Sequence, residues 1–328
     1  MIPAITEPGS DREQLTSLAR TCSGIGDAIP TVLTMTVVPI LGAGSSMADY
    51  RIGFKWWALI IAVVFVISEF VCVACVPEKP VACDEKPGKI SDMFKALFKN
   101  DQAMTVVVSI ILVYTSLNIC GNLVLYFFRF DVGNEGAYSV FAAVAFAAQV
   151  LVMMVIPLLR KRFSKGCLFI SGFIIQIAGY AVILIMAFSK LYTPQSWYIL
   201  CMPSILIYLG YCMLNVIMTI FLSDSVDYGE VMNGTREESV IFSMQTFTVK
   251  LASGVAVFLA GLIVDWIHLD TSATVQTQDT LDALRMWMTI PSVILLIVGI
   301  FVFKRFYRLD DARMEEIKSK LNSENDAG

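Results

Sequence analysis

The feature of this sequence that most constrains its fold is a series of apolar runs, each about 20 residues long. An α-helix of about that length spans the roughly 30 Å hydrocarbon core of a bilayer. Of the 328 residues, 57% are hydrophobic and only 16% are charged, whereas a soluble domain carries about a quarter charged residues. A lipid-facing β-barrel would show alternating apolar residues instead of continuous runs. The sequence therefore predicts an all-α integral membrane protein.

Eight spans are predicted from these runs. They cover residues 20–42, 56–76, 103–128, 138–159, 167–188, 197–222, 240–264 and 286–303. The polar stretch between the second and third spans contains three prolines and an amphipathic segment that Ser91 can cap. We therefore expect two spans in 1–76, a middle loop at 77–102, a six-helix bundle in 103–306 and a tail at 307–328.

Lysine and arginine counts predict the orientation, because loops on the cytoplasmic side carry an excess of both. Seventeen of these residues fall on one side if the N-terminus, the middle loop, 160–166, 223–239 and the tail lie together. The opposite loops hold only four. We therefore expect both termini to be cytoplasmic, which requires an even number of spans.

The seventh span carries a polar stripe with a lysine in its middle. The steps of four and three residues along this span place five polar side chains on one helical face: Ser239, Ser243, Thr246, Lys250 and Ser253. Gln245 flanks that face. Lys250 lies about 11 residues, or roughly 16 Å, past the cytoplasmic end of the helix. This is close to the bilayer midplane, where a charge is costly and where transporter substrate sites lie.

Three other spans repeat the pattern of polar groups on one face. The first span carries Arg20, Asp27, Thr31 and Thr34; the third carries Thr115, Asn118, Asn122 and Tyr126; the sixth carries Tyr208, Tyr211, Asn215 and Thr219. Hydroxyl, amide and ring groups of this kind suit a hydroxyl-rich solute, which both donates and accepts hydrogen bonds. Two alternatives remain: Ser and Thr can bond to their own backbone, and Asn can pack between helices. Asp27 can also pair with Arg20.

An acidic run follows the sixth span. Asp224, Asp227 and Glu230 are three residues apart and can share a helix face. A metal cluster is one interpretation. A charged network at a helix end, with Arg236 nearby, is the interpretation we favour, because a transporter needs bonds that form in one state and break in the other.

The residues around this run resemble a known family. The segments 224–230 (DSVDYGE) and 243–250 (SMQTFTVK), with Arg236 and 238–239 between them, resemble the signature region of the glycoside–pentoside–hexuronide:cation symporters, the family of melibiose permease within the major facilitator superfamily. The resemblance extends to 11–15 (DREQL), 99–102 (KNDQ) and 306–309 (FYRL).

The resemblance implies twelve helices, of which this chain would hold helices five to twelve, so that the N-terminal four are missing. It also implies a sugar site between two six-helix bundles that open alternately. Arg20 and Lys250 would contribute to that site or to its coupling. Gln245 and Thr246 match sugar-side positions, and Asn118 matches an asparagine on helix seven.

Two departures from the family pattern matter. Asn215 occupies a helix-ten position that is tryptophan in melibiose permease, so an aromatic platform is in doubt there. The acidic cation ligands of the family lie on helices two and four, so the ligands for Na⁺ or H⁺ would lie on the missing helices. Asp27 has no acidic counterpart in the family.

We therefore predict a secondary active transporter in the cytoplasmic membrane that moves a sugar, glycoside or hexuronide with Na⁺ or H⁺ by alternating access. We expect it to be a monomer without a cofactor or a nucleic-acid partner. The predicted substrate-binding residues are Lys250, Arg20, Gln245, Thr246, Asn118, Asn215 and Asp27. The predicted charge network at the cytoplasmic gate consists of Asp224, Asp227, Tyr228, Glu230 and Arg236.

The alternative to a transporter is a truncated, non-transporting fragment or a mis-started gene product of the same family. A membrane enzyme is disfavoured, because the sequence offers no nucleophile–base pair and no metal-ligand constellation.

Overall fold

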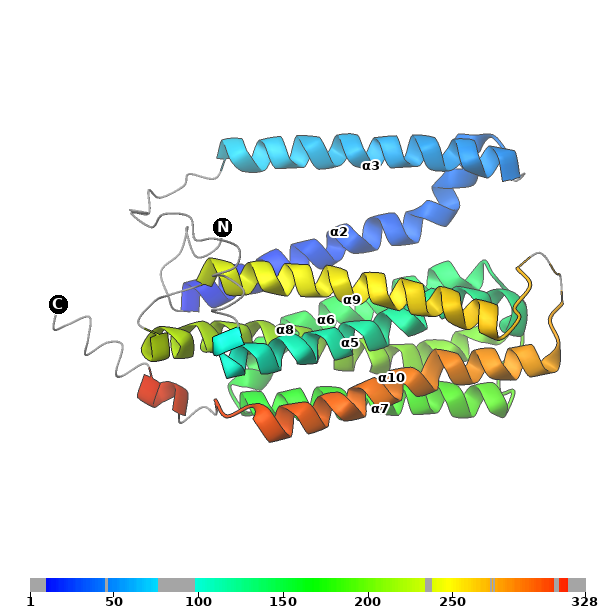
Figure 1. The fold of residues 1–328 in the computed structure, drawn as a ribbon. Coiled ribbons are helices and arrows are strands. Elements are labelled where there is room, and N and C mark those ends of the chain that lie inside the picture. Colours follow the sequence, from blue (N-terminus) through cyan, green and yellow to red (C-terminus); the bar gives the residue numbers. More distant parts are fainter. Residues whose placement is uncertain are drawn as a thin grey trace. The chain divides into compact units, whose positions relative to one another are not determined.

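The computed structural model describes residues 10–44, 47–75, 98–233, 238–271, 273, 275–309 and 313–317. Within these ranges the chain is helical and contains no strand, as predicted. The long helices are α2 (Ser10–Gly42), α3 (Met47–Cys75), α5 (Asp101–Tyr126), α6 (Ala137–Arg160), α7 (Lys165–Phe188), α8 (Cys201–Asn233), α9 (Glu238–Trp266) and α10 (Gln278–Phe306) (Figure 1). A π-helical turn, η1 (Phe127–Val132), continues α5, and a 3₁₀ turn, η2 (Trp197–Leu200), precedes α8.

Seven helices in the described part of the chain are long and apolar enough to cross a membrane. They correspond to the second to eighth predicted spans. The first predicted span lies within α2, which is long enough at 33 residues but is not among the seven. Its sequence is more polar, with Arg20 and Asp27 inside the predicted span.

Two helices extend well beyond the predicted spans. α8 continues to Asn233, so Asp224, Asp227 and Glu230 lie on its last turns and not in the loop that the hydropathy pattern indicates. This stretch contains no proline and only the single Gly229, and the next strong break is Asn233-Gly234. α10 begins at Gln278, where the Thr277 side chain accepts a hydrogen bond from the backbone N–H of Thr280 (3.3 Å) and caps the helix. Apolar run length locates the membrane core, not the helix ends.

The chain divides into two compact units, described here one at a time. Unit 1 comprises residues 1–86 and 139–154, and unit 2 comprises residues 87–138 and 155–328. In unit 1, α2 packs against α3. The indole N–H of Trp57 donates to the Thr34 hydroxyl (2.8 Å), and a Cβ at Gly53 would clash with the Val38 carbonyl oxygen. The apolar stretch of α3 is not buried, as lipid-facing side chains require.

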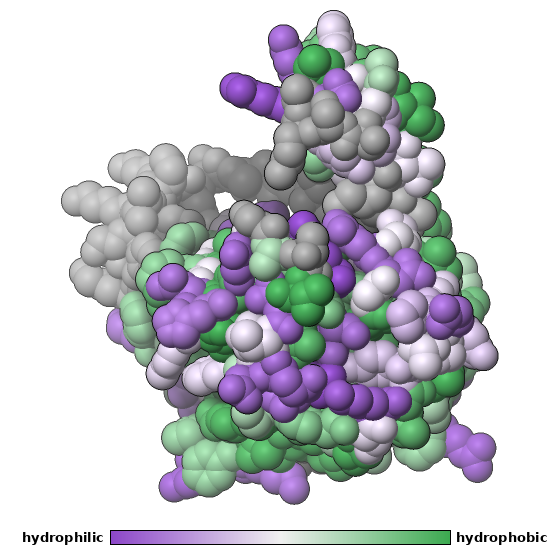
Figure 2. Space-filling model, turned by 90° about the vertical axis from the view of Figure 1, so that its right-hand side faces the viewer, coloured by the Kyte–Doolittle hydropathy of each residue, from purple (hydrophilic) through white to green (hydrophobic). Residues whose placement is uncertain are grey.

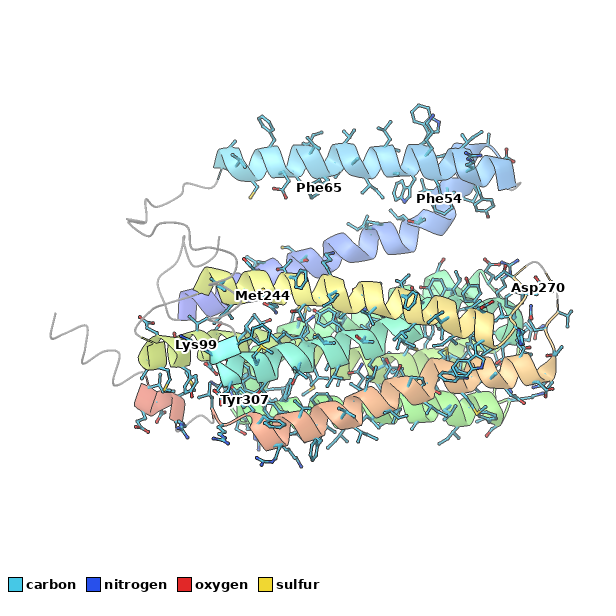
Figure 3. All side chains as sticks on the ribbon, in the orientation of Figure 1. Phe54, Phe65, Lys99, Met244, Asp270 and Tyr307 are labelled. Carbon is cyan, nitrogen blue, oxygen red and sulfur yellow. The ribbon has the colours of Figure 1, made fainter. Side chains whose placement is uncertain are left out.

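In unit 2, α5 packs against α8, α9 and α10, and α7 packs against α8 and α10. Figure 3 shows Lys99 and Tyr307 at one end of this bundle and Asp270 at the other; we call these the Tyr307 end and the Asp270 end. Figure 2 looks onto the Asp270 end, where hydrophilic residues gather across the middle of the bundle. This is the pattern expected where helices leave a bilayer.

The α7–α8 contact depends on glycine. A Cβ at Gly210 would lie 2.5 Å from the Gly172 carbonyl oxygen and 2.6 Å from the Gln176 backbone nitrogen. Small residues let two helix backbones approach closely, which is the usual basis of helix packing in membranes. The two glycines therefore set the separation of α7 and α8.

Polar bonds join α5 to α10 at three levels. At the Tyr307 end, the Gln102 amide donates to the Phe306 carbonyl (3.4 Å) and accepts from the Arg308 N–H (2.8 Å). In the middle, the hydroxyls of Ser116 and Ser292 each donate to the other's backbone carbonyl (3.1 and 2.8 Å). At the Asp270 end, an ion pair described below joins the two elements. The three levels fix α5 and α10 against each other along their length.

Candidate functional site

The open face of α9 carries Lys250. The side chains of Ser243, Thr246 and Lys250 are exposed, at positions that share one helical face, as the stripe predicts. Lys250 lies near the middle of the 29-residue helix and forms no ion pair with any described side chain. Thr246 donates to its own backbone at the Phe242 carbonyl (3.3 Å), which is the alternative role considered for such residues. The Ser239 side chain lies outside the described residues.

Gln245 lies on a different side of α9. Its side chain is 8% exposed, and its amide donates to the Thr219 hydroxyl of α8 (3.4 Å). The rest of this buried side is largely small, with Thr248, Ala252, Ala256 and Ala260 between 0% and 5% exposed. The structure therefore separates Gln245 from Lys250: the amide faces the bundle and the amine faces outward.

Asn215 joins α8 to α5. Its side-chain amide nitrogen donates to the Tyr114 hydroxyl (2.9 Å) and to the Tyr211 hydroxyl (3.1 Å). The two rings lie edge to face, with centroids 5.6 Å apart and planes at 82°. The Tyr208 ring lies 6.5 Å from that of Tyr211. Tyr114 was absent from the predicted stripe, although its spacing of four residues from Asn118 could have revealed it.

Asn118 and Asn122 continue the polar face of α5. Both side chains are half-buried. Their amide groups donate to backbone carbonyls of the same helix, at Tyr114 and at Asn118 respectively, each at 2.7 Å. Neither side chain bonds to another helix within the described residues, so the interhelical alternative applies to Asn215 and not to these two. Their side-chain oxygens remain available as acceptors.

The acidic run at the end of α8 meets a lysine from α7. The Lys165 ammonium lies 2.5 Å from Asp224 Oδ2, and the two side chains are only 10% and 8% exposed. Next to this pair, the Asn100 amide donates to the Ser225 carbonyl (2.7 Å), and its oxygen caps α5 at the Ala103 N–H (2.9 Å). Sequence reasoning missed Lys165 as a partner, because it counted that residue only as a loop charge.

The other members of the predicted charge network differ in surroundings. Asp227 and Glu230 are half-buried and each takes part in polar interactions. Tyr228 packs against an apolar cluster of Leu309, Met314 and Ile317. Within the described ranges, no three His, Cys, Asp or Glu side chains are placed to hold a metal ion. Arg236 lies outside the described residues, as do residues 91–97 of the predicted amphipathic segment.

Arg20 and Asp27 lie on α2, in unit 1. Their backbone is helical, but their side chains lie outside the described residues. Their predicted pairing, and their predicted place in a substrate site, therefore stay predictions.

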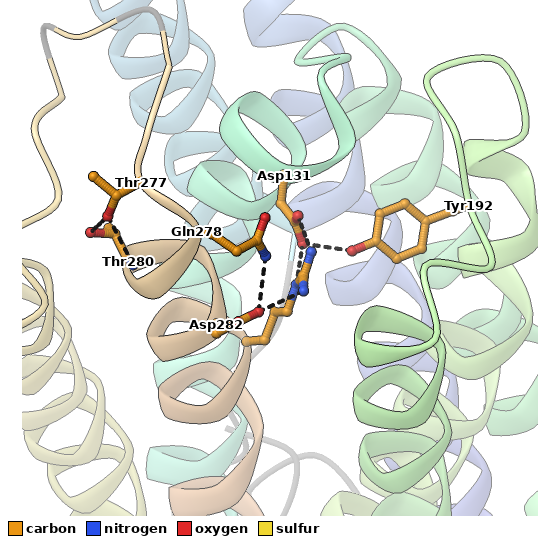
Figure 4. A network of polar contacts seen from close by, with 7 residues as sticks. Asp131, Tyr192, Thr277, Gln278, Thr280 and Asp282 are labelled. Atoms are coloured by element: carbon orange, nitrogen blue, oxygen red, sulfur yellow. Dashed lines mark hydrogen bonds and ion pairs between the residues drawn. The ribbon is translucent and has the colours of Figure 1, made fainter.

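A second polar centre at the Asp270 end was not predicted. Arg285 of α10 binds both carboxylate oxygens of Asp131 in η1, through Nε (2.8 Å) and Nη2 (2.5 Å). The Tyr192 hydroxyl donates to Asp131 Oδ2 (2.5 Å), and Asp282 accepts from Arg285 Nη1 (2.8 Å) (Figure 4). Tyr192, in the connection between α7 and η2, is 7% exposed. Burial and the neighbouring Asp131 carboxylate raise the pKa of its hydroxyl above the ordinary value.

These features define a class: a multi-pass helical membrane protein with polar faces inside its spans. A family model described as MFS/sugar transport protein matches residues 1–311. The chain belongs to this family, which lies within the superfamily that the signature segments indicate.

Several curated proteins are similar to nearly the whole chain. The raffinose carrier protein of Pediococcus pentosaceus is 25% identical over 98% of this chain and 50% of its own length. The lactose permease of Lactobacillus delbrueckii subsp. bulgaricus is 25% identical, over 99% of this chain and 51% of its own. The putative sulfoquinovose importer of Escherichia coli is 24% identical, over 99% and 68%. This chain thus spans about half to two thirds of the length of these relatives.

Proposed function

We propose that this chain belongs to a secondary active transporter that moves a sugar, glycoside or hexuronide across the cytoplasmic membrane by alternating access, coupled to Na⁺ or H⁺. The single observation that carries the proposal is Lys250, a lysine exposed on the open face of a long apolar helix. A charge at membrane depth costs at least a few kcal/mol and is retained chiefly where it serves transport or coupling.

Each polar group has a proposed role. Lys250 binds polar or anionic groups of the solute, together with Arg20 of α2. Asn118, Asn215 and Gln245 supply amide groups that donate to and accept from sugar hydroxyls. Thr246 and Asp27 complete the predicted site. The names of the raffinose, lactose and sulfoquinovose relatives support a sugar as the solute class.

The charges at the Tyr307 end have a separate role. In this proposal the Lys165–Asp224 pair holds the ends of α7 and α8 together in one state, and Asp227, Tyr228, Glu230 and Arg236 belong to the same network. The excess of lysine and arginine on this side supports a cytoplasmic location for this end and for both termini.

The test is uptake of radiolabelled lactose, raffinose and sulfoquinovose by cells that lack their own carriers and express the full chain. We expect accumulation of at least one of the three sugars against its gradient. Lys250→Met should abolish accumulation without lowering the amount of protein in the membrane. Lys304→Met removes an exposed lysine at the end of α10 and should leave uptake unchanged.

Full accumulation by Lys250→Met would overturn the assigned role of the lysine. The absence of uptake of any of the three sugars by the unaltered chain would count against transport by this chain. Lys250→Arg is an informative intermediate, since it keeps the charge but replaces a compact ammonium by a planar group.

A further inference from the structure

We infer that Tyr114 of α5 and Tyr211 of α8, held by Asn215, form a subsite for one ring of the transported sugar. The inference rests on the proposed function and adds to it two residues that determine specificity. We call the three residues the tyrosine corner. The corner lies entirely within unit 2.

The hydrogen bonds of the corner determine what it offers a ligand. Asn215 uses its amide nitrogen on both tyrosine hydroxyls. Each hydroxyl oxygen therefore accepts one bond and keeps its own hydrogen. The Tyr211 hydroxyl also forms a side-chain hydrogen bond with Tyr114. The Tyr114 hydroxyl donates to no other group among the described residues, so its O–H is the free donor of the corner.

The rings supply the second element of recognition. The two rings pack edge to face, with their planes at 82°, and Tyr114 is half-buried whereas Tyr211 is buried. A sugar ring presents C–H groups on one face and oxygens around its rim, so its apolar face can lie on the Tyr114 ring while a rim oxygen accepts from the Tyr114 hydroxyl. Ligand sites commonly combine apolar walls with a few fixed polar groups in this way.

The corner borders the open face of α5. Tyr114, Asn118 and Asn122 are half-buried, at a spacing of four residues. Each asparagine uses one amide N–H on its own backbone, which leaves its second N–H and its side-chain oxygen for a ligand. The donor at the corner and the amide groups along α5 therefore match the mixed hydrogen bonding of adjacent sugar hydroxyls. The corner also provides aromatic rings beside Asn215, the position where the family resemblance puts a platform in doubt.

The competing explanation is that Asn215 only ties α5 to α8, as buried amides do in membrane bundles. The two explanations differ in one measurable respect. A subsite makes the effect of losing a tyrosine hydroxyl depend on which oxygens the sugar carries. A structural tie affects all sugars equally.

The experiment measures binding to the full chain in lipid nanodiscs by titration calorimetry. The probes are lactose, raffinose and sulfoquinovose, followed by the monodeoxy derivatives of whichever binds. The variants are Tyr114→Phe and Tyr211→Phe, each of which removes one hydroxyl and keeps the ring. Tyr198→Phe is the control, since Tyr198 is 62% exposed in the η2 turn before α8 and belongs to none of the polar stripes.

We expect Tyr114→Phe and Tyr211→Phe each to weaken binding of the parent sugar about three- to tenfold, the usual effect of one lost hydrogen bond. One monodeoxy derivative should bind the unaltered chain more weakly than the parent sugar does, by a similar factor. To the Phe variants, that derivative and the parent sugar should bind equally tightly. Tyr198→Phe should match the unaltered chain for every sugar.

The outcomes separate the two proposals. If Lys250→Met loses binding while both Phe variants discriminate among the deoxy sugars as the unaltered chain does, the subsite is wrong and the proposed function stands. If no probe binds the unaltered chain, both fail. If both Phe variants unfold in thermal melts while Tyr198→Phe does not, the corner is a structural tie and the inference is overturned. If only one unfolds, the other carries the test.

Discussion

Arg285 and Asp131 form a two-point ion pair between residues 154 positions apart in the sequence. Their side chains are 3% and 4% exposed. The planar guanidinium matches the two carboxylate oxygens, and Tyr192 and Asp282 satisfy further bonds of the pair. Helix α10, the turn η1 and the connection after α7 are therefore joined at one point.

The first prediction concerns the stability that depends on this pair. Arg285→Met leaves Asp131 buried without its counter-charge, and we expect the free energy of unfolding to fall by about 3–5 kcal/mol. The control is Arg129→Gln, which breaks an exposed pair with Glu135 (3.8 Å, side chains 43% and 55% exposed) and should cost about 0–1 kcal/mol. Denaturant unfolding in detergent measures both. Equal costs would contradict the prediction.

The second prediction concerns pH. The raised pKa of Tyr192 means that folding favours its protonated form. The resulting stabilisation is complete below the unfolded pKa of about 10 and is lost as the pH rises through the higher folded value. Tyr192→Phe should therefore lower stability at neutral pH by about 1–3 kcal/mol and reduce the further loss above about pH 10.

The control for this experiment is Tyr198→Phe, because Tyr198 is 62% exposed in the neighbouring turn. Chemical unfolding curves from neutral to alkaline pH supply the measurement. A Tyr192→Phe variant that loses stability with pH as steeply as the unaltered chain would refute the assignment.

The third prediction concerns the close approach of α7 and α8. Gly210→Ala places a methyl group against the backbone of Gly172 and Gln176, and we expect destabilisation of about 1–3 kcal/mol. Gly254→Ala on α9 is the matched control, because nothing lies within 4 Å of its added methyl. It should be neutral or stabilising by up to about 1 kcal/mol, since alanine favours a helix. Thermal melts of the two variants in the same detergent give the comparison.

The fourth prediction concerns the Lys165–Asp224 pair. Lys165→Met leaves a buried carboxylate, whereas Lys165→Met combined with Asp224→Asn removes both charges and should cost less. Hydrogen exchange should show faster opening of the ends of α7 and α8 in the single variant. Lys161→Met, at an exposed position before α7, should leave exchange unchanged. Unchanged protection in Lys165→Met would contradict the prediction.

The helices were predictable because each apolar run is long enough to leave only a spanning helix as a solution. The open stripe of α9 was also predictable, since a period of 3.6 residues is independent of the neighbours. The place of Gln245 was not predictable. Which side of a polar helix packs depends on the shape of adjacent helices, and here the buried side is the one with alanines.

The unpredicted contacts share a physical cause. Arg285 and Asp131 look like isolated charges near span ends, and no local spacing relates residues so far apart. The contact between Lys165 and Asp224 was missed for the same reason, because the two residues lie on different helices. α8 extends past the apolar run because hydropathy falls at the membrane surface, while the helix continues through Gly229 to the break at Asn233-Gly234.

The three levels of bonding between α5 and α10 have a consequence for synthesis. These are the first and last spanning helices of unit 2, and Arg285 is made long after Asp131 has entered the membrane. Until then, Gln102, Ser116 and Asp131 lack their partners on α10, and Ser116 lies in the middle of the helix, where unsatisfied polar groups are costly. Unit 2 therefore closes only when its final helix arrives, and a nascent chain that stops before α10 leaves all three levels open.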